Sequence, residues 1–238
     1  MHLSDDYADL SRQAAAAFAE VARAKPDATV ILATGNTPIG MYDELTRLVH
    51  AGTVDLSRLR VFQLDEYVGI APDDRRALYG WMDRAALAPW GVPAEHVVRL
   101  PSRSDDFPAA IAAYEAAIAA AGGIDLCILG LGPNGHIGFN EPPADRDAPT
   151  RLIDLTPESI ASNAPYWGGI DQVPTKAITA GMRVLLASRR IFLLVSGGAK
   201  RAILHEALHG PVTSQVPASF LQSAAGVEVF ADRAAAGA

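Results

Sequence analysis

A glycine-rich segment in the middle of the chain carries three side chains that can handle protons. It reads LGLGPNGHIGFNEP over residues 129–142 and delivers Asn134, His136 and Glu141 within eight residues, directly after the largely apolar run 124–129. A neutral imidazole can both give and accept a proton near pH 7, and a neighbouring amide or carboxylate can orient it. Loops after strands are where α/β proteins place their chemistry, so these three residues are candidate catalytic residues.

The same segment also fits the G-x-G-x-x-G spacing of a dinucleotide-binding turn, at 130–135. That turn needs a helix that begins in the glycines and an acidic ribose partner about twenty residues later. Here Pro142 and Pro143 follow the turn and oppose a long helix. If each residue is considered alone, His136 would be interpreted as an ordinary structural histidine and Glu141 as a solvated charge in a loop. Their joint placement after a strand favours a proton-handling site.

A second candidate is the pair of adjacent carboxylates Asp65 and Glu66, which follows the predicted strand 60–64. Neighbouring side chains of an extended segment point to opposite sides, so only one of the two is expected to face a cleft. Partial burial would raise the pKa of that carboxyl group and suit it to act as a general base. An ordinary acidic loop is the alternative when this segment is considered alone.

Two further loops have the composition of an anion site. One lies between a predicted strand and a helix, where free N–H groups and the helix dipole attract negative charge, although a plain capped turn looks similar. Its residues are Thr34, Gly35, Asn36 and Thr37. The other reads SGGAK at 196–200 and places Lys200 in the first turn of the next predicted helix. A lysine opposes the helix dipole there unless it meets an anion, so the two loops together predict a phosphate site.

Apolar runs of strand length alternate with alanine-rich stretches of helical period. This pattern predicts an α/β fold, a Rossmann-like and mostly parallel sheet flanked by helices. Strands are expected at 29–33, 60–64, 126–129, 191–195 and 227–230. Helices are expected at 9–24, 39–51, 78–87, 107–121, 176–186 and 200–208. Segment 142–175 contains six prolines and weak periodicity, so we expect a lid segment with short helices there rather than a second domain.

Composition bounds the class of protein. The 238 residues are half hydrophobic and contain no linker pattern, so we expect one domain over 1–238. The net charge of −7, without a basic cluster, argues against nucleic acid or an anionic membrane as a partner. Cys127 is the only cysteine and lies in an apolar run, so no disulfide can form within the chain. Neither a signal peptide nor a membrane-spanning run is present, and a cytoplasmic location is expected.

Taken in order, these segments resemble the glucosamine-6-phosphate deaminases, within the wider group of sugar-phosphate isomerase folds that includes the 6-phosphogluconolactonases. The matching motifs are TGNTPIGMYDEL at 34–45, LDEYVG at 64–69, GPNGHIGFNEP at 132–142, QVPTKAIT at 172–179, SGGAK at 196–200 and PASFLQ at 217–222. Tyr67 and the ending Phe-Asn-Glu-Pro at 139–142 resemble the deaminase branch. The lactonase branch typically has arginine in place of that tyrosine and lacks the Asn-Glu-Pro ending.

The resemblance implies aldose–ketose isomerisation of glucosamine-6-phosphate with loss of ammonia, a combined hydrolase and isomerase activity that needs no metal or organic cofactor. It implies that His136 opens the pyranose ring, while Glu141 and Asn134 orient the imidazole of His136 and tune its acidity. Asp65 is then expected to take the C2 proton and return it at C1. Many family members have aspartate where this chain has Asn134, but asparagine also occurs there.

Other departures concern the substrate and the assembly. The family usually carries a lid arginine, in a pattern like N-x-R-F-F, where this chain has Pro165. Losing that contact would weaken phosphate binding by about 1.5–3 kcal/mol, which leaves open a different or less charged substrate. Arg75, Arg76 and Arg151 are the candidate replacements. Of the residues that hold an N-acetylated sugar phosphate activator in hexameric members, only Arg151 persists, so an unregulated monomer or small homo-oligomer is expected.

Two alternatives stay open. One is an isomerase or a lactonase that acts on another phosphorylated sugar. The other is a non-catalytic sugar-phosphate sensor, since effector domains of some bacterial transcription regulators resemble this fold. Such regulators carry a DNA-binding helix-turn-helix, for which 238 residues leave no room. A sensor would also have no need of Asp65, His136 and Glu141 together.

Overall fold

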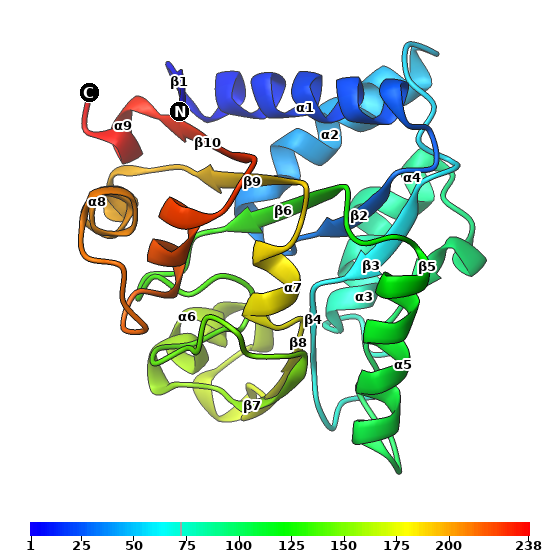
Figure 1. Ribbon diagram of the computed structural model, residues 1–238, viewed down its shortest axis with the longest axis vertical. Helices are drawn as coiled ribbons and strands as arrows, with labels where there is room; N and C mark the ends of the chain where they lie inside the picture. Colours follow the sequence, from blue (N-terminus) through cyan, green and yellow to red (C-terminus); the bar gives the residue numbers. More distant parts are fainter. Residues whose placement is uncertain (72) are drawn as a thin grey trace.

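The central layer of the protein is a seven-stranded parallel sheet (Figure 1). The computed structural model describes residues 1–71 and 73–238. The strand order is β1-β10-β9-β6-β2-β3-β5. The strands are β1 (His2–Ser4), β2 (Thr29–Leu32), β3 (Arg60–Gln63), β5 (Val97–Val98), β6 (Leu126–Gly130), β9 (Arg190–Val195) and β10 (Val227–Asp232). The expected α/β fold with a mostly parallel sheet is confirmed.

Helices cover this sheet; in Figure 1, α1 lies above it, α7 lies below it and α8 lies at its left-hand side. The amphipathic pattern of α1 explains its place, because Leu10, Ala14 and Phe18 recur at helical spacing and are all buried. The Asp6 side chain caps the same helix by accepting a hydrogen bond from the N–H of Asp9. The helices are α1 (Tyr7–Ala24), α2 (Asn36–His50), α3 (Leu78–Met82), α4 (Ala88–Trp90), α5 (Phe107–Ala120), α6 (Pro157–Trp167), α7 (Met182–Leu186), α8 (Arg201–His209) and α9 (Arg233–Ala236).

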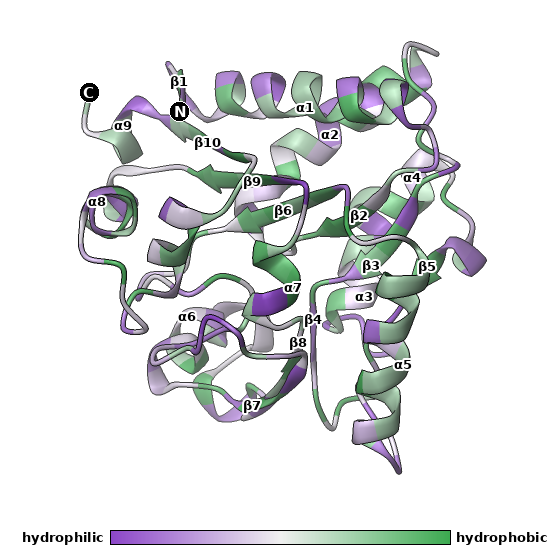
Figure 2. Ribbon diagram, viewed as in Figure 1, coloured by the Kyte–Doolittle hydropathy of each residue, from purple (hydrophilic) through white to green (hydrophobic). Residues whose placement is uncertain are grey.

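The hydrophobic core lies on both sides of the middle strands. All of β2 is buried, and β6 and β9 are buried apart from one end residue each. Figure 2 shows β6 and β9 mostly in the hydrophobic colour. Near continuous apolar strands are typical of a parallel sheet that is covered on both faces.

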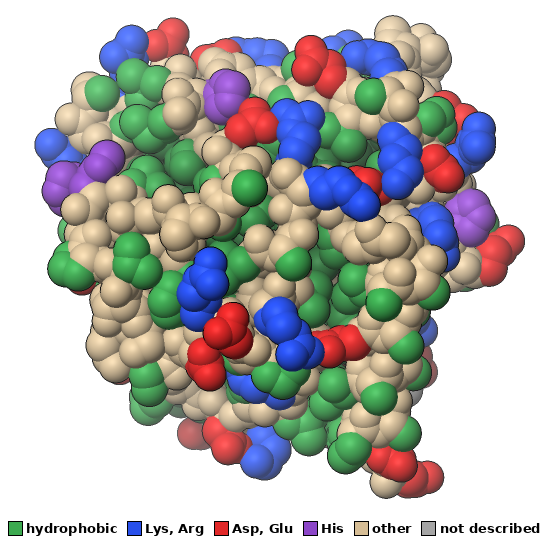
Figure 3. Space-filling model, in the orientation of Figure 1, with side chains coloured by type: hydrophobic (Ala, Val, Ile, Leu, Met, Phe, Trp, Pro, Cys, Tyr) green, Lys and Arg blue, Asp and Glu red, His purple; other side chains and the backbone are tan. Residues whose placement is uncertain are grey.

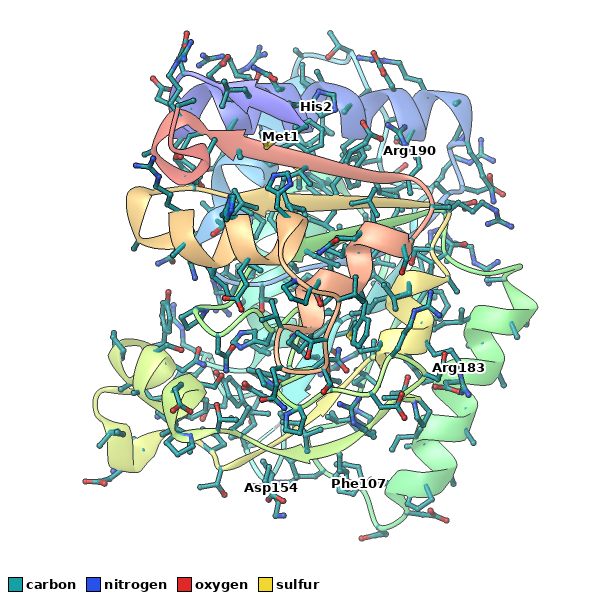
Figure 4. The ribbon with its side chains drawn as sticks, turned by 60° about the vertical axis from the view of Figure 1, so that its left-hand side comes forward. Met1, His2, Phe107, Asp154, Arg183 and Arg190 are labelled. Carbon is teal, nitrogen blue, oxygen red and sulfur yellow. The ribbon has the colours of Figure 1, made fainter. Side chains whose placement is uncertain are left out.

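Ion pairs connect elements at the surface of the protein. In Figure 4, Arg183 of α7 lies beside α5, where it donates to Glu115 at 2.8 Å.

A second sheet, antiparallel and three-stranded, departs from the sequence-based expectation. Its order is β4 (Asp65–Tyr67), β8 (Lys176–Thr179) and β7 (Arg151–Asp154). The helix expected over 176–186 is therefore wrong: β8 occupies its first part and α7 begins only at Met182. Pairing with a strand on each side outweighs the local helical pattern. Gly181 separates the two elements and packs so closely on Pro149 that an added Cβ would overlap that backbone.

Other boundaries shift by a few residues. The helix expected at 78–87 is α3 followed by a π-helical turn at 83–87 and then α4. α2 begins at Asn36 rather than at residue 39. Lys200 ends a short 3₁₀ turn at 198–200, so it lies just before α8 rather than in its first turn. β1, β4, β5 and β7 have two to four residues each, which is too short for periodicity to reveal.

The segment 142–175 contains β7, α6 and a 3₁₀ turn at 170–172. α6 and the small sheet surround a second hydrophobic cluster, separate from the main core. Its buried residues are Tyr67, Phe139, Leu155, Trp167, Val173 and Ala177. Within it, the ring of Tyr67 packs edge-on against Trp167 with centroids 5.0 Å apart. α6 is thus held on the small sheet by its carboxyl end. Over the part of the chain that the structure describes, no helix is long and apolar enough to cross a membrane.

Candidate active site

A cavity of about 510 Å³ lies where the parallel strands end. The loops after β2, β3 and β6 form its floor, and Lys200 reaches it from the loop after β9. These loops meet because parallel strands bring their carboxyl ends to one edge of the sheet. On the other side the wall is formed by α6 and by residues 75–78, which lead into α3. Lining residues from those two parts are Ser162, Asn163, Tyr166, Trp167, Arg75, Arg76 and Leu78.

Asp65 and Glu66 lie in β4 and face different surroundings. Asp65 lines the cavity, and its Oδ1 is buried with no hydrogen-bond partner among the described residues. Burial, together with the neighbouring Glu66 charge, raises the pKa of Asp65 to about 8. Glu66 points away, and its oxygens accept hydrogen bonds from the side chain of Gln63 and from the N–H groups of Tyr67, Leu78 and Tyr79. The carboxyl group of Asp65 thus faces the cavity, whereas that of Glu66 holds the first residues of α3 in place.

His136 projects into the cavity from the loop after β6, with Glu141 behind it. Its Nδ1 lies 3.4 Å from Oε2 of Glu141, an ion-pair separation slightly longer than a good hydrogen bond. Asn134 joins the two: its Nδ2 donates to Glu141 Oε2 at 3.0 Å, and its Oδ1 accepts from the backbone N–H of His136 at 3.2 Å. The imidazole lies flat against Gly132, where an added Cβ would overlap the ring. The loop therefore fixes the orientation of the imidazole.

Glu141 is 8% exposed, yet it is held in its charged form. Burial opposes ionisation, but contacts with His136, Ser159 and Asn134 outweigh it and lower the pKa of Glu141 to about 2. The hydroxyl of Thr156 also donates to Oε2, at 3.2 Å. Thr156 caps α6 and Ser159 lies in the first turn of that helix; neither residue was predicted from the sequence. Their pattern is that of a helix cap, which gives no sign of a partner fifteen residues earlier.

The two loops expected to bind an anion reach the same cavity. Thr34, Gly35, Asn36 and Thr37 all line it, and so does Lys200. Gly35, at φ 104°, precedes α2, and no side chain caps the first turn of that helix. The backbone N–H groups of the first turn of α2 are thus available to a ligand. Partial burial lowers the pKa of Lys200, and within residues 1–71 and 73–238 no carboxylate pairs with it.

Asp232 supports the second of these loops and is another residue that the sequence did not reveal. It lies at the end of β10, next to β9, and accepts hydrogen bonds from the Ser196 hydroxyl and from the N–H of Gly197. Its Oδ1 also caps α9 by accepting from the N–H of Ala235 at 2.7 Å. One carboxylate thereby fixes the turn that carries Lys200.

Three arginines were candidates to replace the missing lid arginine at Pro165, and the structure separates them. Arg151 does not line the cavity; its guanidinium donates to Asn140 Oδ1 at 2.8 Å. Arg76 lines the cavity but forms a two-point contact with Asp74 and lies over Trp167, 4.4 Å from the ring centroid. Arg75 also lines the cavity, and its side chain has no ion pair in the described part of the chain.

Charge elsewhere on the molecule is mixed. On the face shown in Figure 3, basic and acidic side chains are interspersed rather than gathered by sign. His2 and Arg190, labelled in Figure 4, both contact Glu228 of β10 at the far side of the sheet from α6. Among residues 1–71 and 73–238, no group of three or more His, Cys, Asp and Glu side chains is arranged to hold a metal ion.

Known proteins resemble this chain over its whole length. The family model described as glucosamine-6-phosphate isomerases/6-phosphogluconolactonase matches residues 4–230. The glucosamine-6-phosphate deaminase of Rhodopirellula baltica is 41% identical over 231 residues, covering 97% of this chain and 92% of that protein. The glucosamine-6-phosphate deaminase of Halothermothrix orenii is 40% identical over 241 residues, covering 98% and 97%.

Two solved structures place the fold among the same proteins. A monomeric glucosamine-6-phosphate deaminase superposes with a TM-score of 0.96 at 35% identity, covering 100% of this chain and 99% of that one. The 6-phosphogluconolactonase from Trypanosoma cruzi superposes with a TM-score of 0.77 at 19% identity, covering 99% and 96%. At that identity the lactonase shares the fold, and nothing about its activity carries over.

Proposed function

Since this chain belongs to the family of glucosamine-6-phosphate isomerases and 6-phosphogluconolactonases, we propose that it converts glucosamine-6-phosphate and water into fructose-6-phosphate and ammonia. The relatives about 40% identical to it are named glucosamine-6-phosphate deaminases. The observation that carries the proposal is one cavity lined by Asp65, whose raised pKa is about 8, by His136 and by Lys200. These are a base, a proton relay and an anion anchor, the three parts that this reaction needs.

The first step is opening of the pyranose ring, and we assign it to His136. The imidazole moves a proton from the C1 hydroxyl to the ring oxygen, which breaks the bond between C1 and that oxygen and leaves an aldehyde. Glu141 is charged at neutral pH because its pKa is about 2. Its carboxylate stabilises the imidazolium that forms during the transfer. Asn134 holds both partners in place through its two hydrogen bonds.

The second step moves a proton across one carbon–carbon bond, and we assign it to Asp65. Its carboxylate removes the proton from C2 of the open-chain sugar, and the aldehyde oxygen takes up a proton from the ammonium group on C2 to give a neutral enolamine. The same carboxyl group then delivers its proton to C1, which leaves an iminium ion at C2. Water adds to C2 and ammonia departs, so the sum consumes one water and is a hydrolysis as well as an isomerisation. A base with a pKa near the working pH suits such a shuttle.

The phosphate end of the substrate is assigned to the loop at 34–37, to the start of α2 and to Lys200. Unpaired N–H groups at a helix start and a half-buried ammonium together match a phosphate dianion. Anchoring the phosphate there orients the sugar chain, with C1 and C2 between Asp65 and His136. Binding energy from this remote group then serves to position the reacting atoms.

We further propose that residues 1–238 form one domain with 142–175 as its lid. A monomer or small homo-oligomer fits the neighbour with a TM-score of 0.96, which is described as monomeric. A cytoplasmic location fits the substrate, because a doubly charged sugar phosphate does not cross a bilayer unaided. No organic cofactor or metal is assigned a step in this scheme.

A panel of hexose phosphates tests the assignment. The protein would be incubated with glucosamine-6-phosphate, its C2 epimer mannosamine-6-phosphate, glucose-6-phosphate and 6-phosphogluconolactone. Ammonia, ketose phosphate and lactone hydrolysis would all be measured. Equal amounts of ammonia and fructose-6-phosphate from glucosamine-6-phosphate support the proposal. Isomerisation of glucose-6-phosphate without ammonia release from any amino sugar, or hydrolysis of 6-phosphogluconolactone instead, would replace it with one of the related activities. Binding without turnover of any substrate would indicate a sensor.

A further inference from the structure

The lid helix α6 contacts the candidate site at both of its ends. Its carboxyl-terminal half contributes Ser162, Asn163, Tyr166 and Trp167 to the cavity wall. Its amino-terminal turn does not line the cavity, but lies against the carboxylate of Glu141 behind His136. Because α6 is one continuous helix of eleven residues, a single element connects the wall of the cavity with the back of the proton site.

Thr156 is the main contact at the amino-terminal end. Its hydroxyl oxygen accepts a hydrogen bond from the N–H of Ser159 at 3.3 Å and donates its own proton to Glu141 Oε2 at 3.2 Å. The first interaction caps α6, and the second serves the carboxylate. A hydroxyl group can do both at once, whereas an ordinary carboxylate cap can only accept.

Ser159 supplies a second hydroxyl next to the same carboxylate. The residue is completely buried and is among the groups that lower the pKa of Glu141. Its Oγ and the Oε1 of Glu141 are both buried, and neither has a well-aligned hydrogen-bond partner in the described part of the chain. A rotation of this hydroxyl is therefore sufficient to direct its proton at the carboxylate. The amino end of a helix adds a partial positive charge in the same direction.

We propose that Thr156 and Ser159 are positioning residues of the proton site, through which the first turn of α6 sets how tightly the Glu141–His136 pair holds its proton. The proposal rests on the function assigned above to His136. Among the described residues, His136 is the one titratable group in contact with the carboxylate; Asn134, Thr156 and Ser159 are its neutral neighbours. Each hydroxyl that donates to Glu141 makes it a weaker acceptor, so removing a hydroxyl strengthens its hold on the imidazole proton.

Four variants separate this role from capping. Thr156→Ser keeps both interactions. Thr156→Asp keeps the cap but replaces the donor with a second negative charge. Ser159→Ala removes a hydroxyl that has no part in capping. Ser11→Ala is the matched control, because it deletes a buried hydroxyl in α1 that donates to the carbonyl of Tyr7, outside the cavity.

The decisive measurement is the pH titration of His136, followed by ¹⁵N shifts of the imidazole in the full-length protein. We expect the midpoint to be unchanged in Thr156→Ser and Ser11→Ala. It should rise by about half a unit or more in Ser159→Ala and further in Thr156→Asp. The acid limb of the kcat/KM profile should move the same way, with kcat reduced about tenfold and KM changed by less than about threefold.

Helix fraying alone would lower Tm and raise KM without moving the titration midpoint. Midpoints in Ser159→Ala and Thr156→Asp that coincide with the wild-type value overturn the proposal, whatever happens to kcat. The titration needs no turnover, so it is independent of the assigned reaction. A wild-type protein that releases no ammonia contradicts the proposed function, and the midpoints still decide whether the two hydroxyls act on Glu141.

Discussion

Asp65 and Glu66 are neighbours in one short strand, yet the surroundings treat their carboxyl groups in opposite ways. Glu66 is satisfied by Gln63 and three backbone N–H groups. Asp65 is buried with an unpartnered oxygen and a pKa raised to about 8 by burial and by the Glu66 charge. One carboxylate stabilises the fold, and the other is kept poorly solvated where it can take a proton.

Replacing Asp65 with asparagine should nearly abolish turnover. The amide keeps the shape of the side chain but cannot accept the C2 proton, and a general base contributes about 10²–10⁴-fold. We expect kcat to fall within that range and KM to stay within a few fold of the wild-type value. Steady-state assays of ammonia release measure both. A variant that keeps more than about a tenth of the wild-type kcat would show that another group is the base.

The same variant should be more stable than the wild type, by an amount that depends on pH. The folded-state pKa of Asp65, about 8, lies above the ordinary value of 3.8 for an aspartate. Between these values the folded protein holds a proton that the unfolded chain has released, so the wild type loses stability as pH rises from about 4 to about 8. Asparagine does not titrate, so the variant has no such loss. In urea unfolding, the gap between the free energies of unfolding of Asp65→Asn and of the wild type should be small near pH 4 and exceed about 1 kcal/mol at pH 8. A gap independent of pH would contradict the raised pKa.

Gly132 tests how the His136 ring is held. A Cβ at this position would overlap the imidazole, and the backbone there does not require glycine because its φ is not positive. Gly132→Ala should therefore fold normally but displace the ring, with kcat lowered by about 10²-fold because orientation of a reacting group is lost. Gly130→Ala is the steric control, since nothing lies within 4 Å of its added Cβ. Equal, small effects of both changes would show that the ring position is not critical.

Lys200 should contribute to binding of the substrate phosphate and not to the rate of the chemical steps. Lys200→Ala is expected to raise KM for a phosphorylated substrate about ten- to a hundredfold, because a charge-assisted contact is lost. The inhibition constant of inorganic phosphate should rise in parallel, with kcat little changed. Lys176→Ala provides the comparison, as that lysine pairs with exposed Asp154 outside the cavity. No change in phosphate inhibition would remove the two-loop anion site.

Arg75 and Pro165 should be coupled through the substrate. Arg75 lines the cavity without an ion-pair partner in the described part of the chain, and Pro165 lies in α6 between the lining residues Asn163 and Tyr166. If Arg75 supplies the charge that Pro165 cannot, Arg75→Ala should raise KM about tenfold. Pro165→Arg in that background should restore much of the loss. Additive effects in the double-mutant cycle would show that the two positions do not act on a shared group.

The sequence predicts the local parts of this site well and the non-local parts poorly. Asn134, His136 and Glu141 lie within eight residues after a strand, so their proximity follows from the chain itself. The support that Thr156 gives Glu141 and that Asp232 gives the loop at 196–197 depends on tertiary packing. No spacing rule reveals such pairs. β8 illustrates the same limit, because its partners β4 and β7 decide its conformation against a helical pattern.

The lid shows an intermediate case. Six prolines and weak periodicity over 142–175 indicated a segment with short helices, and α6 is present with Pro157 at its start, where proline is tolerated. Its second proline, Pro165, lies inside the helix, which local rules disfavour. Burial of Trp167 against Tyr67 in the second hydrophobic cluster provides the tertiary contact that holds this helix in place.

Deuterium transfer tests the central claim most directly. Glucosamine-6-phosphate would be converted in D₂O, and the fructose-6-phosphate and ammonia analysed together. With Asp65 as a single-carboxyl shuttle, we predict one mole of ammonia per mole of ketose, with deuterium on one face of C1 only. Asp65→Asn should suppress both products in the same proportion. Ammonia released without a matching amount of ketose phosphate, or equal deuterium on both faces of C1, would contradict a proton shuttle by Asp65.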